Sequence, residues 1–311
     1  MSAVSGSGVE ILMATRNGAD HIAEQLASIA RQTHPDWSLV VSDDGSSDAT
    51  ADLVARFASG VPSRRVSLRA GPSRGSTANF LSLLAGPGAA PFTALADQDD
   101  IWLPDKLSRA VAQLGPCGPA PALYGARTII VDGAGRRLGL SPRFRRRPGF
   151  PNALVQSFAG GNTMVLNSAA RRLAAEAAGR LACLPACHDW WLYQIVAGAG
   201  GRVLYDPVPV LLYRQHGRNQ IGANLGPRAA LRRMRLGLAG QFRRWSDQNL
   251  AALQTSAQIL SDDARRLLDE FARIRQRRGP AAALALRRAG LHRQTLRGDL
   301  TLALAAVLGK L

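Results

Sequence analysis

The 311-residue sequence contains little cysteine, almost no lysine and no long hydrophobic run. It has three cysteines, Cys117, Cys183 and Cys187. This small, odd number argues against a disulfide framework and is consistent with a reducing compartment. The start of the chain has no basic region followed by an apolar run, so we expect no secretory signal. The apolar stretch at 300–309 is about half the length of a membrane span. We therefore expect a cytoplasmic protein that can lie on the inner face of the cell membrane.

Acidic residues are also scarce, and their scarcity is uneven. The chain has 39 Lys and Arg against 22 Asp and Glu, for a formal net charge of +17, and its only lysines are Lys106 and Lys310. Nineteen basic but only six acidic residues lie between Arg214 and Leu311. A basic surface attracts anionic partners, either an anionic membrane surface or nucleic acid. Nucleic acid is less favoured, because this region lacks interleaved aromatics, zinc-finger spacing and a recognition-helix module.

Strand-like and helix-like segments alternate over the first third of the chain. Apolar runs predict strands at 9–14, 37–42, 66–69 and 92–96. Between them, apolar residues recur at helical spacing, as at Ile22, Leu26 and Ile29. This alternation predicts a doubly wound α/β sheet with mostly parallel strands. Beyond Leu225 the pattern becomes helical and rich in arginine.

Polar side chains follow three of the predicted strands. The groups are Thr15-Arg16-Asn17, Asp43-Asp44 and Asp97-Gln98-Asp99-Asp100. Because ligands of doubly wound sheets bind beyond the carboxyl ends of the strands, we expect these groups to meet at one edge. Mg²⁺ or Mn²⁺ held there by one or two carboxylates could neutralise the diphosphate of a nucleotide. Taken alone, two aspartates separated by one residue are equally well explained as helix-capping carboxylates in a loop.

Six motifs occur in a fixed order between Val9 and Gly222. They are ILMATRNG (11–18), VSDDGSSD (41–48), ALADQDDIWLPDKL (94–107), GGNTM (160–164), HDWW (188–191) and YRQHG (213–217). Together they resemble the inverting glycosyltransferases of family two, and the longest resembles the branch that includes bacterial rhamnosyltransferases. The resemblance implies a GT-A-like doubly wound mixed sheet with a C-terminal helical extension. It implies a nucleotide-binding half at about 1–123, an acceptor half at about 124–222 and a basic helical extension at 223–311.

The resemblance also implies a donor site. The residues expected to bind the nucleotide sugar are Thr15, Asn17, Asp43, Asp44, Asp97 and Arg214. Asp99 would hold the Mg²⁺ or Mn²⁺ that bridges the diphosphate, and His216 would either join it as a ligand, contact the leaving phosphates or be structural. Arg16 stands where the family more often has an aromatic residue, although a planar guanidinium can also stack on a base. The expected donor is dTDP- or UDP-linked, with rhamnose as the first choice of sugar.

Asp189 is the candidate general base of this reaction. An inverting transfer needs a carboxylate that takes the proton of the acceptor hydroxyl as its oxygen attacks the anomeric carbon. Trp190 and Trp191 are expected to shield this carboxylate and to offer a flat face to the acceptor, with Gly161 and Asn162 nearby. The acceptor is expected to be a saccharide or a lipid-linked saccharide. The alternative is a helix-capping aspartate beside two core tryptophans.

Three other interpretations are weaker. Cys183, Cys187 and His188 have no second Cys/His pair to complete a zinc site. QFRRW at 241–245 matches a motif of processive polysaccharide synthases, which we treat as coincidence in an Arg-rich region. A nucleotidyltransferase usually has a Gly-rich basic loop after its first strand, unlike residues 15–18.

The basic C-terminal helices could lie on anionic lipid or form a solvated cap on the domain. The residues considered for lipid contact are Leu231, Arg232, Arg233, Arg235, Leu236, Leu238, Phe242, Arg243 and Arg244.

Overall fold

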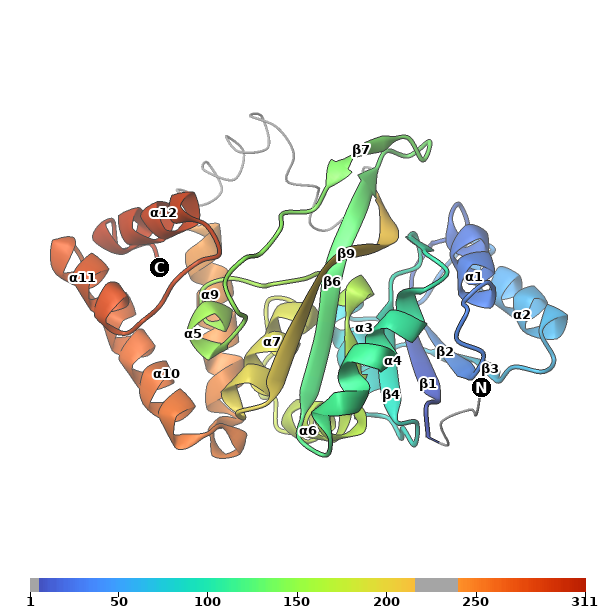
Figure 1. Cartoon of the computed structure of the whole chain (residues 1–311), viewed down its shortest axis with the longest axis horizontal. Coiled ribbons are helices and arrows are strands. Elements are labelled where there is room, and N and C mark those ends of the chain that lie inside the picture. Colours follow the sequence, from blue (N-terminus) through green and yellow to red (C-terminus); the bar gives the residue numbers. More distant parts are fainter. Residues whose placement is uncertain (1–5, 216–239) are drawn as a thin grey trace.

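The computed structural model describes residues 6–215 and 240–311 of the chain. At its centre lies one mixed sheet in the order β3-β2-β1-β4-β8-β6-β9-β5, with β7 paired to β6 (Figure 1). The strands are β1 (Val9–Thr15), β2 (Trp37–Asp43), β3 (Val66–Ala70), β4 (Phe92–Ala96), β5 (Ile101–Trp102), β6 (Ala122–Val131), β7 (Arg137–Leu140), β8 (Val165–Asn167) and β9 (Arg202–Arg214). Strands β3, β2, β1 and β4 are parallel, whereas β8 runs antiparallel to β4 and β6. The predicted α/β fold with a mixed sheet is confirmed.

Helices cover both faces of the parallel half of the sheet. They are α1 (Ile22–Ala30), α2 (Thr50–Gly60), α3 (Ser76–Ala85) and α4 (Lys106–Leu114). Successive side chains of a strand point to opposite faces, so in β1 Ile11 joins the core under α1 and α4, whereas Leu12 joins the core under α3. Because both faces are buried, β1 and β4 read as continuous apolar runs in the sequence.

The other half of the sheet joins segments that lie far apart in the sequence. Strands β6 and β9 pair in parallel, with register shifts between Ala126 and Ile129. Helices α5 (Phe150–Ala153), α6 (Ser168–Ala178) and α7 (His188–Gly198) contribute to the same core as α3. A turn at 132–135 connects β6 to β7.

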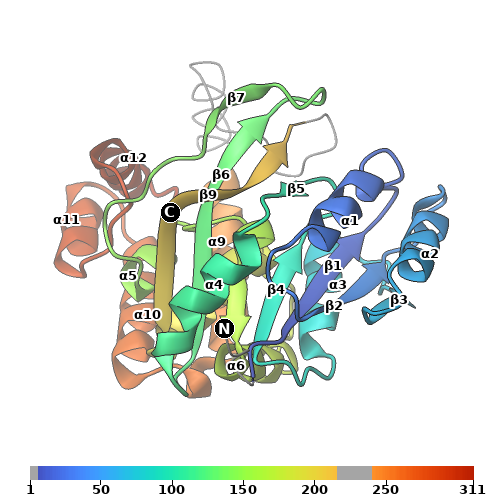
Figure 2. The ribbon, with the colours of Figure 1, turned by 45° about the vertical axis from the view of Figure 1, so that its right-hand side comes forward.

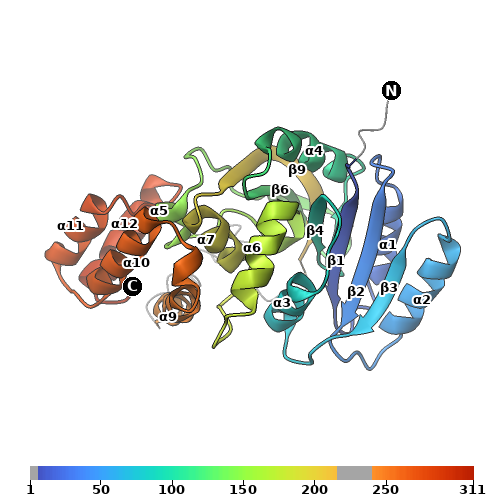
Figure 3. The same ribbon diagram turned by 90° about the horizontal axis from the view of Figure 1, so that it is seen from below.

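The C-terminal helices gather at one end of the molecule, away from α1 and α2 (Figures 1 and 3). They are α9 (Gln241–Gln254), α10 (Asp262–Arg275), α11 (Pro280–Arg288) and α12 (Leu296–Val307). Leu260 and Phe271 share one core cluster with Trp191 of α7. A Cβ placed on Gly198 would lie 2.8 Å from Leu260 Cδ2, so the extension packs tightly on the sheet domain.

The predicted boundary between 222 and 223 lies outside the described residues, as do the residues proposed for lipid contact between 231 and 238. Within residues 6–215 and 240–311, no helix has both the length and the apolar character needed to span a membrane.

Candidate active site

The three polar groups predicted at strand ends meet at one edge of the sheet. Strands β1, β2 and β4 run side by side (Figure 2). Thr15 at the end of β1 is in register with Asp43 at the end of β2, and Met13 is in register with Ala96 of β4. Asp97 follows Ala96 directly, so the acidic motif begins beside the other two groups.

Asp43 is held in place by its neighbours and remains half-buried. Thr15 Oγ1 donates to Asp43 Oδ1 at 3.1 Å, and the Ser46 hydroxyl donates to the same oxygen at 2.5 Å. Thr15 itself is only 2% exposed, so it acts through Asp43 rather than on a ligand directly. An open pocket of about 300 Å³ lies beside these residues and is lined by Asp43, Gly45, Leu68, Arg69, Ala70, Gly71 and Ser73.

Two of the predicted nucleotide ligands instead hold loops together. Asn17, with a φ of 47°, accepts a bond from the Ser47 amide at Oδ1, 2.8 Å away. Asp44 is 2% exposed, and its two carboxylate oxygens accept bonds from the amides of Ser73 and Gly75, each at 2.7 Å. The expectation that Asp44 contacts the nucleotide does not fit this burial, because both of its oxygens fix the loop that forms the pocket wall.

Gln98 joins the loops that follow β1 and β4. Its Oε1 accepts a bond from the Arg16 amide at 2.8 Å, and its Nε2 donates to the Arg16 carbonyl at 3.0 Å. A Cβ on Gly18 would lie 2.3 Å from Gln98 Oε1, so this glycine makes room for the amide. The sequence interpretation did not assign Gln98. An amide between two carboxylates of the acidic motif is the signal that could have revealed it.

The acidic motif places several carboxylates close together. Burial, together with the negative charges of Asp99 and Asp189, raises the pKa of Asp97 to about 7, and Lys106 partly opposes this shift. Asp100 is 1% exposed, and burial, followed by the charges of Asp97 and Asp99, raises its pKa well above the usual value. Such mutual repulsion in a poorly solvated site is relieved when a cation binds.

Lys106 is a buried cation beside this cluster and was not predicted as a site residue. Its side chain is 0% exposed, and burial lowers its pKa well below the usual value, against the pull of Asp100 and Asp97. Its Nζ lies 3.0 Å from the centroid of the Trp102 ring and has no hydrogen-bond partner within residues 6–215 and 240–311. The ring face therefore supplies cation–π stabilisation where a hydrogen bond is missing.

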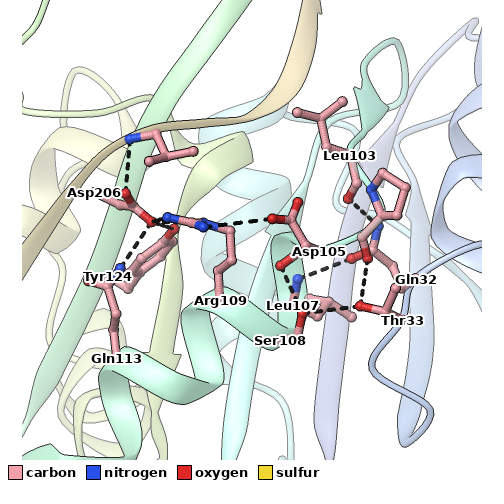
Figure 4. Close-up of polar contacts among 12 residues, drawn as sticks. Gln32, Thr33, Leu103, Asp105, Leu107, Ser108, Arg109, Gln113, Tyr124 and Asp206 are labelled. Carbon is pink, nitrogen blue, oxygen red and sulfur yellow. Dashed lines mark hydrogen bonds and ion pairs between the residues drawn. The ribbon is translucent and has the colours of Figure 1, made fainter.

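The start of α4, which carries Lys106, is fixed from both sides (Figure 4). Gln32 Nε2 donates to the Leu103 carbonyl at 2.7 Å, and Gln32 Oε1 accepts from the Leu107 amide at 3.0 Å. On the other side, Arg109 forms an ion pair with Asp206 of β9 at 2.8 Å. The segment that follows the acidic motif therefore cannot shift without breaking contacts to the loop after α1 and to β9.

Asp189 lies in the first turn of α7, on the same side as the acidic motif. Its Oδ2 accepts a bond from the Gly161 amide at 3.1 Å, and its Oδ1 accepts from the Trp190 amide at 2.7 Å. The structure thus brings Asp189 close enough to Asp97 for its charge to raise the pKa of that carboxyl.

Gly161 and His188 pack closely beside this carboxylate. A Cβ on Gly161 would lie 2.5 Å from His188 Nε2, so position 161 accepts no side chain without rearrangement. The His188 ring stacks on Phe80 with centroids 4.0 Å apart, and burial lowers its pKa, an effect that Asp189 partly offsets.

The predicted acceptor contacts are buried. Trp190 is 6% exposed and donates from Nε1 to the Ala153 carbonyl at 2.6 Å, and Trp191 is 0% exposed within the core. Asn162 is 3% exposed and donates to Asp100 Oδ2 at 2.6 Å. The expectation that the tryptophans offer a flat face to a sugar does not fit this burial, because both rings are covered by protein.

Arg214 supports the acidic loop from behind. It is 5% exposed, donates to the carbonyls of Gly133 at 2.9 Å and Asp99 at 3.3 Å, and forms an ion pair with Glu24. Its described contacts thus tie the backbone of Asp99 to α1. His216, the predicted second metal ligand, lies outside the described residues.

The donor set at this edge suits Mg²⁺ or Mn²⁺. These ions accept oxygen ligands and are often held in nucleotide sites by one or two carboxylates together with phosphate oxygens. Within residues 6–215 and 240–311, no three Asp, Glu, His or Cys side chains are grouped to hold a metal. Asp99 would therefore need the phosphates of a ligand to complete the coordination shell.

Comparison with known proteins points to one family. The family profile for glycosyl transferase family 2 matches residues 10–174. The dTDP-rhamnosyl transferase RfbG of Shigella flexneri is 30% identical over 237 residues, which cover 72% of this chain and 78% of the relative. The UDP-Glc:alpha-D-GlcNAc-diphosphoundecaprenol beta-1,3-glucosyltransferase WfgD of Escherichia coli is 29% identical over 106 residues, 34% of this chain and 40% of the relative.

Solved structures share the fold at low sequence identity. Residues 1–349 of S. aureus TarS, in complex with UDP-GlcNAc, superpose with a TM-score of 0.56 at 15% identity, covering 84% of this chain and 86% of TarS. The mannosyltransferase PcManGT of Pyrobaculum calidifontis, in complex with GDP-Man and Mn²⁺, gives a TM-score of 0.51 at 20% identity. The match covers 97% of this chain and 85% of the PcManGT chain. Both are GT-A glycosyltransferases, so the predicted GT-A-like fold is confirmed.

Proposed function

Because this chain belongs to glycosyl transferase family 2 and is a glycosyltransferase, we propose that it transfers rhamnose from a dTDP- or UDP-linked donor to a saccharide or lipid-linked saccharide. The similarity to the dTDP-rhamnosyl transferase of Shigella flexneri supports this choice of donor. The observation that carries the proposal is the convergence of Asp43, Asp97 and Asp189 at one edge of the sheet.

The proposed donor site extends from β2 to β4. Asp43 lines the open pocket and would bind the nucleoside, oriented by Thr15 from behind. Asp97 would bind the ribose, and Asp99 would hold Mg²⁺ or Mn²⁺, with His216 as a proposed further ligand. Such an ion neutralises the diphosphate as it leaves. Support for a metal comes from the carboxylates that repel one another around Asp97, and from the Mn²⁺ in the complex of the Pyrobaculum relative.

Asp189 is the proposed base of an inverting displacement. The Gly161 amide donates to one carboxylate oxygen and the Trp190 amide donates to the other, so the carboxylate is fixed in orientation in the first turn of α7. In this position Asp189 would take the proton of the acceptor hydroxyl while that oxygen attacks the anomeric carbon. Gly161 leaves the space that the carboxylate and His188 occupy.

The acceptor and its location form part of the same proposal. We place the reaction on the cytoplasmic face of a membrane if the acceptor is lipid-linked, because the saccharide would then be displayed at that surface. The net charge of +17 would favour such a surface over a neutral one.

A panel of nucleotide sugars tests the proposed reaction. The purified chain would be incubated with dTDP-rhamnose, UDP-glucose and GDP-mannose, with Mg²⁺, Mn²⁺ or EDTA, and followed by thermal stabilisation and by release of nucleoside diphosphate. We expect stabilisation and metal-dependent release with dTDP-rhamnose. Release of pyrophosphate instead would indicate a nucleotidyltransferase, and an equal response with EDTA would contradict the metal site.

Replacing Asp189 by Asn tests the proposed base. The amide cannot take a proton, so transfer should fall by about 10²- to 10⁴-fold, while the donor still raises the melting temperature. Asp52→Asn is the matched control, because Asp52 is an exposed aspartate in the first turn of another helix, α2. Normal turnover by Asp189→Asn would assign the base to another residue.

A further inference from the structure

Helix α12 carries a row of exposed leucines. Leu296 is 75% exposed, Leu300 72%, Leu304 56%, and Leu308, just past the last residue of the helix, 46%. At 3.6 residues per turn, a step of four residues advances by about 40°, so the four side chains lie within about 120° of one another. These four residues form one apolar surface, called here the leucine face.

The opposite side of α12 is apolar as well. Leu302 is 3% exposed and Ala306 is 0% exposed, and both belong to the core that includes Leu286 of α11. A helix with leucine or alanine rows on two opposite sides normally buries both of these sides. Contiguous exposed apolar surface of this kind marks an interaction site. Among the residues that the structure describes, the leucine face therefore has no packing partner, although its apolar composition favours one.

The charge around the leucine face identifies the kind of partner. Residues 276–311 contain seven arginines and lysines but a single acidic residue, Asp299, which is paired with Arg146. Arg297 is exposed and lies about 100° from Leu296 around the helix, within the span of the leucine face. At the other end, the Arg278 side chain lies against Gly309. A second copy of this chain would bring the same positive charge and be repelled, whereas an anionic surface would be attracted.

We propose that the leucine face docks on the surface of a bilayer that contains anionic lipid. The leucines enter the boundary between headgroups and acyl chains, and the neighbouring cations, Arg297 and Arg278, lie among the phosphates, as in interfacial helices. Figure 1 places α11 and α12 at the end of the molecule farthest from α2, so docking leaves the donor-binding strands clear of the membrane. This inference goes beyond the proposed reaction, because docking requires neither donor nor acceptor.

Vesicle co-sedimentation of the full chain tests the docking. The vesicles contain phosphatidylethanolamine with phosphatidylglycerol, or phosphatidylcholine alone, at low and high salt. We expect binding to the anionic vesicles at low salt, weaker binding at high salt, and at least about a tenfold loss of binding for the double variant Leu300→Glu/Leu304→Glu. Leu138→Glu is the matched control, because Leu138 is 53% exposed on β7 and should bind like the wild type.

Two measurements distinguish docking on lipid from misfolding and from self-association. Both variants should keep the melting temperature and the donor-induced stabilisation of the wild type, because the altered side chains are exposed. Equal vesicle binding by the wild type and Leu300→Glu/Leu304→Glu would overturn the proposal, as would the absence of any binding. A wild-type dimer in light scattering that becomes a monomer in the same variant would assign the leucine face to a second copy instead.

Discussion

Lys106 places a positive charge inside the site, and its ammonium group has no hydrogen-bond partner in the described part of the chain. Its Nζ rests on the Trp102 ring while Asp100 and Asp97 attract it electrostatically. We expect Lys106 and Asp100 to be energetically coupled, since each lowers the cost of burying the other's charge. The coupling energy between Lys106→Met and Asp100→Asn should be about 1 kcal/mol, measured by urea unfolding of the two single variants and the double variant.

The coupling energy distinguishes an electrostatic role of Lys106 from a packing role. Methionine keeps the volume of the chain but removes its charge, and Asn at position 100 can still accept the bond from Asn162. Lys106→Met should therefore cost more stability in the wild type than in the Asp100→Asn background. An equal loss of unfolding free energy in the two backgrounds would show that Lys106 contributes through packing and not through its charge.

His188 should make the stability of the protein depend on pH. Burial lowers its pKa in the folded state, so the unfolded chain binds more protons between that value and 6.5. His188 therefore lowers the free energy of unfolding as pH drops below about 6.5, whereas the raised pKa of Asp97 acts in the opposite direction, so the wild type should lose stability relative to His188→Gln over this range. Urea unfolding between pH 7 and pH 5 measures the difference. The same change at His292, half-buried in the extension, is the control, and identical curves for all three proteins would contradict the prediction.

The sequence motifs predicted which residues lie near one another at the site. They were less informative about the burial and contacts of each side chain. Asp43, Asp97 and Asp189 meet as expected, because strand ends and the order of motifs fix the backbone positions. Asp44 and Trp191 are buried instead, since the burial of a side chain depends on loops and helices that pack over it from elsewhere in the chain. Lys106 escaped prediction for the same reason.

Helix α4 is attached to the sheet by a buried carboxylate. Asp206 Oδ2 accepts bonds from Arg109, from Gln113 Nε2 at 3.0 Å and from the Tyr124 hydroxyl at 2.9 Å (Figure 4). Asp206→Ala leaves these donors without an acceptor, so the free energy of unfolding should fall by about 3 kcal/mol. Tyr124→Phe removes one bond and should cost about 1 kcal/mol. Chemical denaturation of Asp206→Ala and Tyr124→Phe measures these changes. A similar small loss of unfolding free energy in both variants would indicate that water replaces the carboxylate.

Strands of the first half were predictable, whereas the pairing of β6 with β9 was not. An apolar run buried on both faces identifies β1 and β4 from the sequence alone. Strand β9 has an alternating and interrupted burial pattern with Pro207 and Pro209 inside it, and it pairs with β6 through shifted registers. Such a pairing depends on contacts between residues some 80 positions apart, for which local patterns hold no signal.

The whole molecule should unfold as one unit. Residues of α9 and α10 complete the core around α5 and α7, and the Ser261 amide donates to the Gly198 carbonyl at 2.9 Å. A fragment ending at residue 239 would expose that core, so we expect it to aggregate or to lack a cooperative thermal transition by circular dichroism. A monomeric fragment with a sharp transition would make the extension an independent domain.

The amide pair between Gln98 and Arg16 restricts which sequences this enzyme can adopt. The Gln98 side chain accepts a hydrogen bond from the Arg16 amide and donates one to the Arg16 carbonyl. Ionised carboxylates only accept, ammonium groups only donate and aliphatic chains do neither. Position 98, between Asp97 and Asp99, therefore needs a side chain that can both donate and accept a hydrogen bond. We expect tolerated substitutions at position 98 to be limited to side chains that carry both groups and are long enough to contact the backbone of Arg16.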